Sequence, residues 1–138
     1  MRISEPDVSP VLDVARRSKP TDLYAGSTDE ARAPHRDLLD ADGMPGSAIG
    51  GYLVRDYGEL VILADAGLGG HPPAGPFELY PLQRSLLATL SVQGVGPDDL
   101  TDVVFYHLHA DHTGWATKGE RLSFGPLPTG VTHRTGPT

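Results

Sequence analysis

The chain has 138 residues, with 11 Lys and Arg against 18 Asp and Glu, and a formal net charge of −7. This length fits one domain with a modest core, and an acidic chain without a Lys/Arg stripe argues against nucleic-acid binding. The absence of cysteine excludes disulfides, thiolate zinc sites and cysteine nucleophiles. No signal-peptide core is present, and no apolar run reaches the ~20 residues of a membrane helix. We therefore expect a cytoplasmic protein without a membrane partner.

The first 47 residues carry few patterns. VLDVARR, residues 11–17, fits either a short strand or half a helix. Residues 18–47 are polar and contain repeated Gly and Pro, which predicts a long loop with at most one helical turn around RDLLDA (36–41). We expect residues 1–47 to form an irregular N-terminal segment.

A clear pattern begins at Ala48. Two apolar runs, Ile49–Val54 and Leu60–Ala64, flank the polar stretch RDYGE, which predicts a β-hairpin. The second run is continuous rather than alternating, which favours a strand covered on both faces. It ends at Asp65-Ala66-Gly67, where a loop is expected to start.

The next segments predict a helix and a strand. One helical face from residue 82 to residue 90 carries Leu at four positions, and Gly94 is a plausible helix end: Leu82, Leu86, Leu87, Leu90. Pro97 opens a turn or a single helical turn, and VVFY (103–106) reads as a short buried strand. Strand, helix and strand in this order predict a mixed sheet with a packed helix.

The pattern fades after Trp115. Arg121–Phe124 offers at most one weak strand, and residues 125–138 are mainly Gly, Pro and Thr, typical of a disordered tail. We thus divide the chain into an N-terminal segment (1–47), a structured unit (48–124) and a tail (125–138).

Half of the six histidines lie in the stretch FYHLHADHTGW, residues 105–115. If the strand runs on into this stretch, His107 and His109 point to the same side. Asp111 and His112 are adjacent and are expected to diverge, so the simplest partition is two ions, with His107 and His109 on the first and Asp111 and His112 on the second. Imidazole with carboxylate suits zinc, with manganese, iron or cobalt as alternatives.

HLHADH has the pattern H-x-H-x-D-H and resembles the metal-binding signature of the metallo-β-lactamase-fold hydrolases. The preceding hairpin with its Asp-x-Gly loop, and the helix, turn and strand before the motif, are also similar to that family. The resemblance covers residues 48–124. It implies the N-terminal half of an αββα sandwich, an α/β fold with a mixed sheet, and an apparently truncated chain.

The resemblance also implies roles for individual residues. His107 and His109 would bind a first zinc ion, and Asp111 and His112 a second, with Asp111 also orienting a bridging hydroxide. Asp65 would be a carboxylate behind these ligands, although an Asp that caps the loop at a strand end is equally compatible with the local sequence. The family's further histidine, bridging aspartate and final histidine come from the second half, which this chain does not include.

Two functions follow. The first is a zinc-dependent hydrolase that attacks an ester, lactone, amide or similar bond of a small-molecule substrate through a metal-bound hydroxide. The alternative is a non-catalytic, truncated metal-binding fragment with an incomplete site, which could self-associate through an uncovered sheet face.

Overall fold

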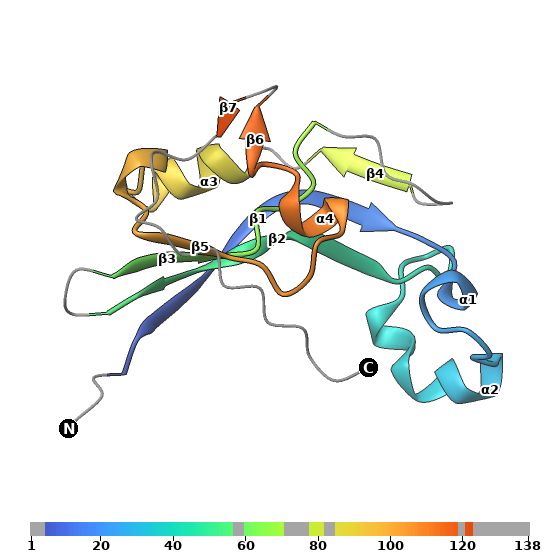
Figure 1. The fold of residues 1–138 in the computed structure, drawn as a ribbon. Helices are drawn as coiled ribbons and strands as arrows, with labels where there is room; N and C mark the ends of the chain where they lie inside the picture. Colours follow the sequence, from blue (N-terminus) through green and yellow to red (C-terminus); the bar gives the residue numbers. More distant parts are fainter. Residues whose placement is uncertain (1–4, 57–59, 71–77, 82–84, 119–120, 123–138) are drawn as a thin grey trace.

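The computed structural model describes residues 5–56, 60–70, 78–81, 85–118 and 121–122. Five strands form one mixed sheet in the order β4-β1-β2-β3-β5 (Figure 1). Neighbouring strands are antiparallel except β3 and β5, which run parallel. Their bounds are β1 (Asp7–Arg17), β2 (Gly46–Arg55), β3 (Val61–Ala64), β4 (Glu78–Pro81) and β5 (Asp102–Val104).

The helices are short, and none in the described ranges is long and apolar enough to cross a membrane. Two α-helices and a 3₁₀ helix connect β1 to β2, and α3 and α4 lie together on one side of the sheet (Figure 1). A small hairpin follows α4. The bounds are α1 (Pro20–Leu23), α2 (Asp29–Arg32), η1 (Ala33–Leu38), α3 (Leu86–Val92), η2 (Pro97–Asp99), α4 (Ala110–Thr113), β6 (Thr117–Lys118) and β7 (Arg121–Leu122).

Strand β1 corrects the expectation for the N-terminal segment. Residues 7–17 form a full strand that pairs with β2 along its whole length, so the prediction of irregular structure over 1–47 is wrong there. VLDVARR is a strand rather than half a helix. The predicted loop of 18–47 is also more ordered than expected, since it contains α1, α2 and η1. The division into domains stays a prediction.

The predicted hairpin is confirmed as β2 and β3. Tyr52 pairs with Ala64 and Arg55 with Val61, and the second strand begins at Val61 rather than at Leu60. The parallel partner of β3 is β5, so β3 lies between two strands. Its continuous apolar sequence predicted cover on both faces, but only Leu63 is buried, and the other three residues of the strand are half-buried.

The predicted helix is confirmed as α3, which begins at Leu86. The Ser85 side chain accepts a hydrogen bond from the Ala88 amide and caps its first turn. Gly94 adopts a φ of 75°, and the amides of Gly94 and Val95 return to the carbonyls of Ser91 and Leu90, which ends the helix as predicted. Leu82 lies outside the described residues.

The core lies between the sheet and α3. It contains Leu86 and Leu90 of the helix, both without solvent exposure, against buried side chains of four strands and the loops beside them. Phe105 and Trp115 pack at its border. The strand and loop members are Val11, Leu53, Leu63, Ala66, Val95, Leu100 and Val103.

Candidate metal site

The FYHLHADHTGW stretch lies wholly beyond the sheet, whereas the sequence predicted that its first two residues belong to the strand. Strand β5 ends at Val104 instead of Tyr106, so His107 and His109 do not continue a strand. Where the backbone leaves the sheet, the side chain of Asp65, directly after β3, accepts a hydrogen bond from the Tyr106 amide (2.9 Å). A helical turn, α4, follows at once at Ala110.

His107 and His109 still lie together. Nε2 of His107 is 3.1 Å from Nδ1 of His109, and the two rings meet edge to face with centroids 4.5 Å apart. The expectation that both imidazoles bind the same ion is therefore compatible with the geometry, although a bend rather than strand alternation brings them together.

His107 also reaches the helical turn. Ligand atoms of His107, Asp111 and His112 all lie within 4.8 Å of one another, and the rings of His107 and His112 have centroids 4.0 Å apart. The expectation that Asp111 and His112 diverge is wrong, because the ligand atoms of both lie beside His107. The chain is helical here, and successive side chains are separated by only about 100°, against nearly 180° in a strand. The structure thus groups three of the four predicted ligands and sets His109 beside His107.

Asp65 lies directly behind this group. Its Oδ2 is 2.8 Å from Nδ1 of His112, while Nε2 of His112 faces Asp111 Oδ2 at 3.7 Å, too far for a hydrogen bond. Asp65 has a φ of 65°, the one positive value among the described residues other than glycine. A carboxylate at one ring nitrogen fixes the tautomer and leaves the other nitrogen free for a metal.

One buried nitrogen tests whether a metal fits. Nδ1 of His107 has no hydrogen-bond partner among the described residues, whereas Nδ1 of His112 lies 2.8 Å from Asp65 Oδ2 and takes that carboxylate as its partner. Buried polar atoms are nearly always satisfied, so Nδ1 of His107 calls for a partner. Neutral imidazoles with one carboxylate form a donor set that suits zinc, and the residues present fit a divalent cation.

Glycines bring the loops of the site into contact. A Cβ on Gly51 of β2 would lie 2.1 Å from the Asp65 carbonyl oxygen, and one on Gly114 would lie 1.9 Å from the backbone of Leu68. Both distances are far below any tolerated contact. Only glycine allows β2 and the end of α4 to approach the loop after β3 this closely.

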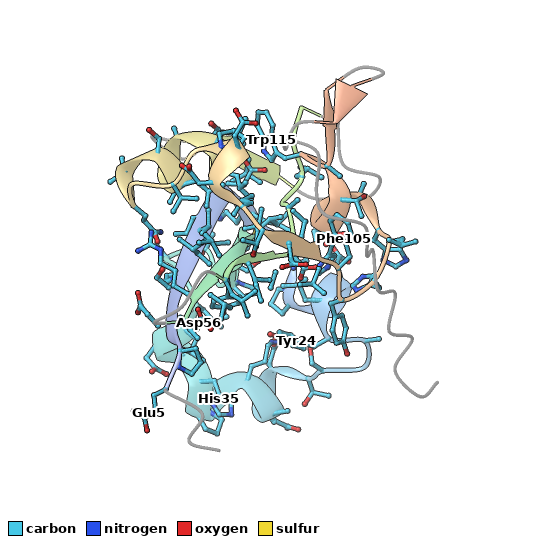
Figure 2. The ribbon with its side chains drawn as sticks, turned by 60° about the vertical axis from the view of Figure 1, so that its left-hand side comes forward. Glu5, Tyr24, His35, Asp56, Phe105 and Trp115 are labelled. Atoms are coloured by element: carbon cyan, nitrogen blue, oxygen red, sulfur yellow. The ribbon has the colours of Figure 1, made fainter. Side chains whose placement is uncertain are left out.

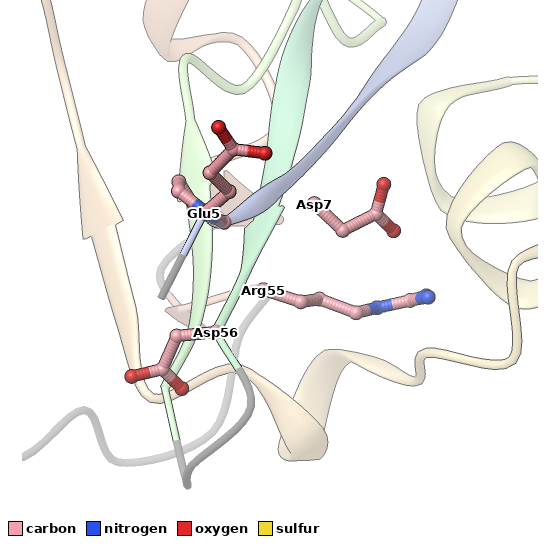
Figure 3. A pocket seen from close by; sticks show the side chains of 5 residues that line it. Glu5, Asp7, Arg55 and Asp56 are labelled. Atoms are coloured by element: carbon pink, nitrogen blue, oxygen red, sulfur yellow. The ribbon is translucent and has the colours of Figure 1, made fainter. Parts of the chain in front are cut away.

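Among the described residues, other charged groups do not form a comparable site. A hollow of about 540 Å³ at the start of β1 is lined by Glu5, Asp7, Arg55 and Asp56, but the carboxylates point in different directions (Figure 3). His35 lies on η1, far from Trp115 and Phe105 in Figure 2. His71 and His133 lie outside the described residues.

Comparisons with known proteins place this geometry in context. No protein-family model and no curated protein matches the chain, whereas solved structures do. AidC, a dizinc quorum-quenching lactonase in complex with the product N-hexanoyl-L-homoserine, superposes with a TM-score of 0.67 at 26% identity, over 91% of this chain and 41% of that one.

Two further structures match at lower identity. A probable metal-dependent hydrolase from Staphylococcus aureus gives a TM-score of 0.70 at 15% identity, over 90% of this chain and 46% of that one. Hydrolase AbOPH of the β-lactamase superfamily gives 0.69 at 19%, over 91% and 40%. The chain spans less than half the length of the structures it matches, which agrees with the expected half of the fold.

Proposed function

We propose that this chain, which has the fold of the metallo-β-lactamase superfamily hydrolases, carries the metal-binding part of a zinc-dependent hydrolase. The observation that carries the proposal is the convergence of His107, Asp111 and His112, with Asp65 behind His112. The matched structures are hydrolases, and a dizinc lactonase is among them. We infer a small-molecule substrate with an ester, lactone, amide or similar bond.

The residues have separate tasks in this proposal. His107, His109, Asp111 and His112 would hold up to two zinc ions, and Asp65 would orient the His112 ring. When bound, zinc supplies Lewis acidity and lowers the pKa of a coordinated water toward neutrality. Asp111 would in addition accept the hydrogen bond that orients the attacking water.

A second candidate function is a non-catalytic metal-binding fragment. The observation that favours it is the length of the chain, which covers 40–46% of the first three matched structures. Two catalytic zinc ions usually take about six protein ligands, more than this loop offers. A fragment of this kind predicts at most one weakly held ion and no hydrolysis.

Zinc content of the purified chain, together with hydrolysis of lactone and ester substrates, tests both functions. We expect zinc to be bound, hydrolysis to be lost on chelation and restored by zinc, and both to be lost in a His107→Ala variant. His35→Ala is the matched control, because it removes an exposed histidine from η1 and should change neither. Zinc without hydrolysis selects the fragment, and no zinc at all contradicts both functions.

A further inference from the structure

Asp13 is a buried carboxylate that the proposed metal site does not use. It lies in the middle of β1 and is 3% exposed. The pairing of β1 with β2 shifts register between Leu12 and Val14, so Asp13 is the extra residue of a bulge. Bulges redirect a side chain out of the regular alternation, and this one places a carboxylate in the core layer between the sheet and α3.

Both oxygens of Asp13 accept two hydrogen bonds each. Oδ2 accepts from the amides of Leu68 (2.9 Å) and Gly69 (3.0 Å), in the loop that follows Asp65. Oδ1 accepts from the Leu86 amide at the start of α3 (3.1 Å) and from the indole Nε1 of Trp115 (2.9 Å). Burying a carboxylate is costly unless it is well hydrogen-bonded, and these four donors from three distant segments meet that need.

The loop held by Asp13 is bonded directly to the backbone of the metal-binding turn. The Ala66 amide donates to the His112 carbonyl (2.6 Å), the Gly114 amide to the Gly67 carbonyl (2.7 Å), and the Trp115 amide to the Ala66 carbonyl (2.9 Å). These three backbone hydrogen bonds begin at His112 and end at Trp115, whose indole donates to Asp13. Asp65, which faces the His112 ring, precedes Ala66 in the same loop.

We propose that Asp13 is a positioning residue for the metal site: it fixes the Ala66–Gly69 loop against Trp115 and thereby sets where His112 and Asp65 stand relative to His107. It touches none of these side chains and acts through the backbone. The inference rests on the proposed metal site and adds to it a supporting residue on β1, beyond the Ala66–Gly69 loop.

The decisive variant is Asp13→Asn, which keeps the shape but turns one acceptor oxygen into a donor. Whichever way the amide is oriented, its NH₂ group meets two N–H donors, so two hydrogen bonds are lost. Zinc affinity is measured by competition with a chromophoric chelator, at a temperature where circular dichroism shows each variant to be folded. We expect zinc affinity to fall about tenfold, the lower end of what loss of a supporting partner costs a metal site.

Two further variants keep the test decisive. Trp115→Phe removes one donor to Asp13 and leaves the other three. We expect about a threefold loss of zinc affinity, smaller than for Asp13→Asn because one hydrogen bond is lost instead of two. This variant decides the matter if Asp13→Asn does not fold. Leu90→Ala opens the same core on the α3 side without touching Asp13. It should lower thermal stability while zinc affinity of the folded protein stays within twofold.

The outcomes separate this inference from the proposed function. If the unmodified chain binds zinc but Asp13→Asn and Trp115→Phe bind it equally well, Asp13 only supports the fold and the inference is overturned. The same follows if Leu90→Ala lowers zinc affinity as much as they do. If the unmodified chain binds no zinc, the proposed function fails and the inference fails with it.

Discussion

The two faces of the five-stranded sheet carry similar side chains but differ in what covers them. On one face Leu53 and Leu63 are fully buried beneath α3. On the other, Leu12 is 40%, Val8 54% and Tyr52 58% exposed. The covered face has a packed core beside the candidate metal-binding turn, whereas the open face has the apolar composition of a core without a described layer over it. A chain that spans less than half the length of the matched structures can therefore pack one face of its sheet while apolar side chains of the other face stay exposed among the described residues.

The largest expected effect is a loss of stability when a core side chain on the covered face is removed. Leu53→Ala removes a fully buried side chain in the middle of β2, and we expect unfolding free energy to fall by about 2–5 kcal/mol. Tyr52→Ala, the next residue on the open face, should cost less than about 1 kcal/mol. Urea unfolding followed by circular dichroism measures both. Equal losses would mean that something covers the open face in solution.

An intermediate effect concerns self-association through the open face, which stays a prediction. Leu12→Lys places a charge among the exposed apolar side chains of that face and should shift the chain toward monomer in sedimentation velocity runs. Val92→Lys makes a similar change at a residue that is 62% exposed on α3, on the covered side, and should leave the distribution unchanged. A monomeric unmodified chain would remove self-association as a property of this face.

The smallest effect is expected at the end of β1, where neither face is involved. The Arg17 guanidinium binds the carboxylates of Asp40 and Asp42, and its hydrogen bond lowers the pKa of Asp40 to about 2. Because the folded pKa lies below the ordinary value, this contribution is present above about pH 4 and is lost as the pH falls toward about 2.

An Arg17→Met variant tests the ion pairs that Arg17 of β1 makes with Asp40 and Asp42 in the segment after η1. The pKa of Asp40 should rise toward its ordinary value of 3.8, as measured by NMR titration of the carboxyl carbon. Stability near neutral pH should change little, because the pair is on the surface. An unchanged titration of Asp40 would show that its backbone donors, rather than Arg17, hold the carboxylate ionised.

The parts of the fold that sequence predicted well are those with local signals. The apolar runs of β2 and β3, the leucine face of α3 and the helix end at Gly94 are all read from residues close together in the chain, and the structure confirms each one, the leucine face from Leu86 onward. The histidine cluster was found in the same way, because all its members lie within six residues. Resemblance then supplied Asp65, which the structure places 2.8 Å from His112.

The missed parts depend on partners far along the chain. Asp13 has no local signal, since its donors are 55, 56, 73 and 102 residues away. An aspartate and Pro10 within β1 speak against a strand when seen alone, and only the pairing with β2 and β4 overrides them. The convergence of Asp111 with His112 was missed for another reason: adjacent side chains are expected to diverge, and the sequence did not predict the helical turn α4 that carries both.

The parallel pairing of β3 with β5 has a consequence for the order of folding. The β2–β3 hairpin can form from neighbouring residues, but β5 can join β3 only after the intervening chain, with α3, has folded back across the sheet. Closing that loop costs entropy before any contact repays it, so this step is slow relative to hairpin formation. Tyr106 and His112, which follow β5, reach Asp65 at the end of β3 only then. If the chain binds metal as proposed, metal affinity is thus a property acquired last, and an ion present during folding would capture the chain at its final step.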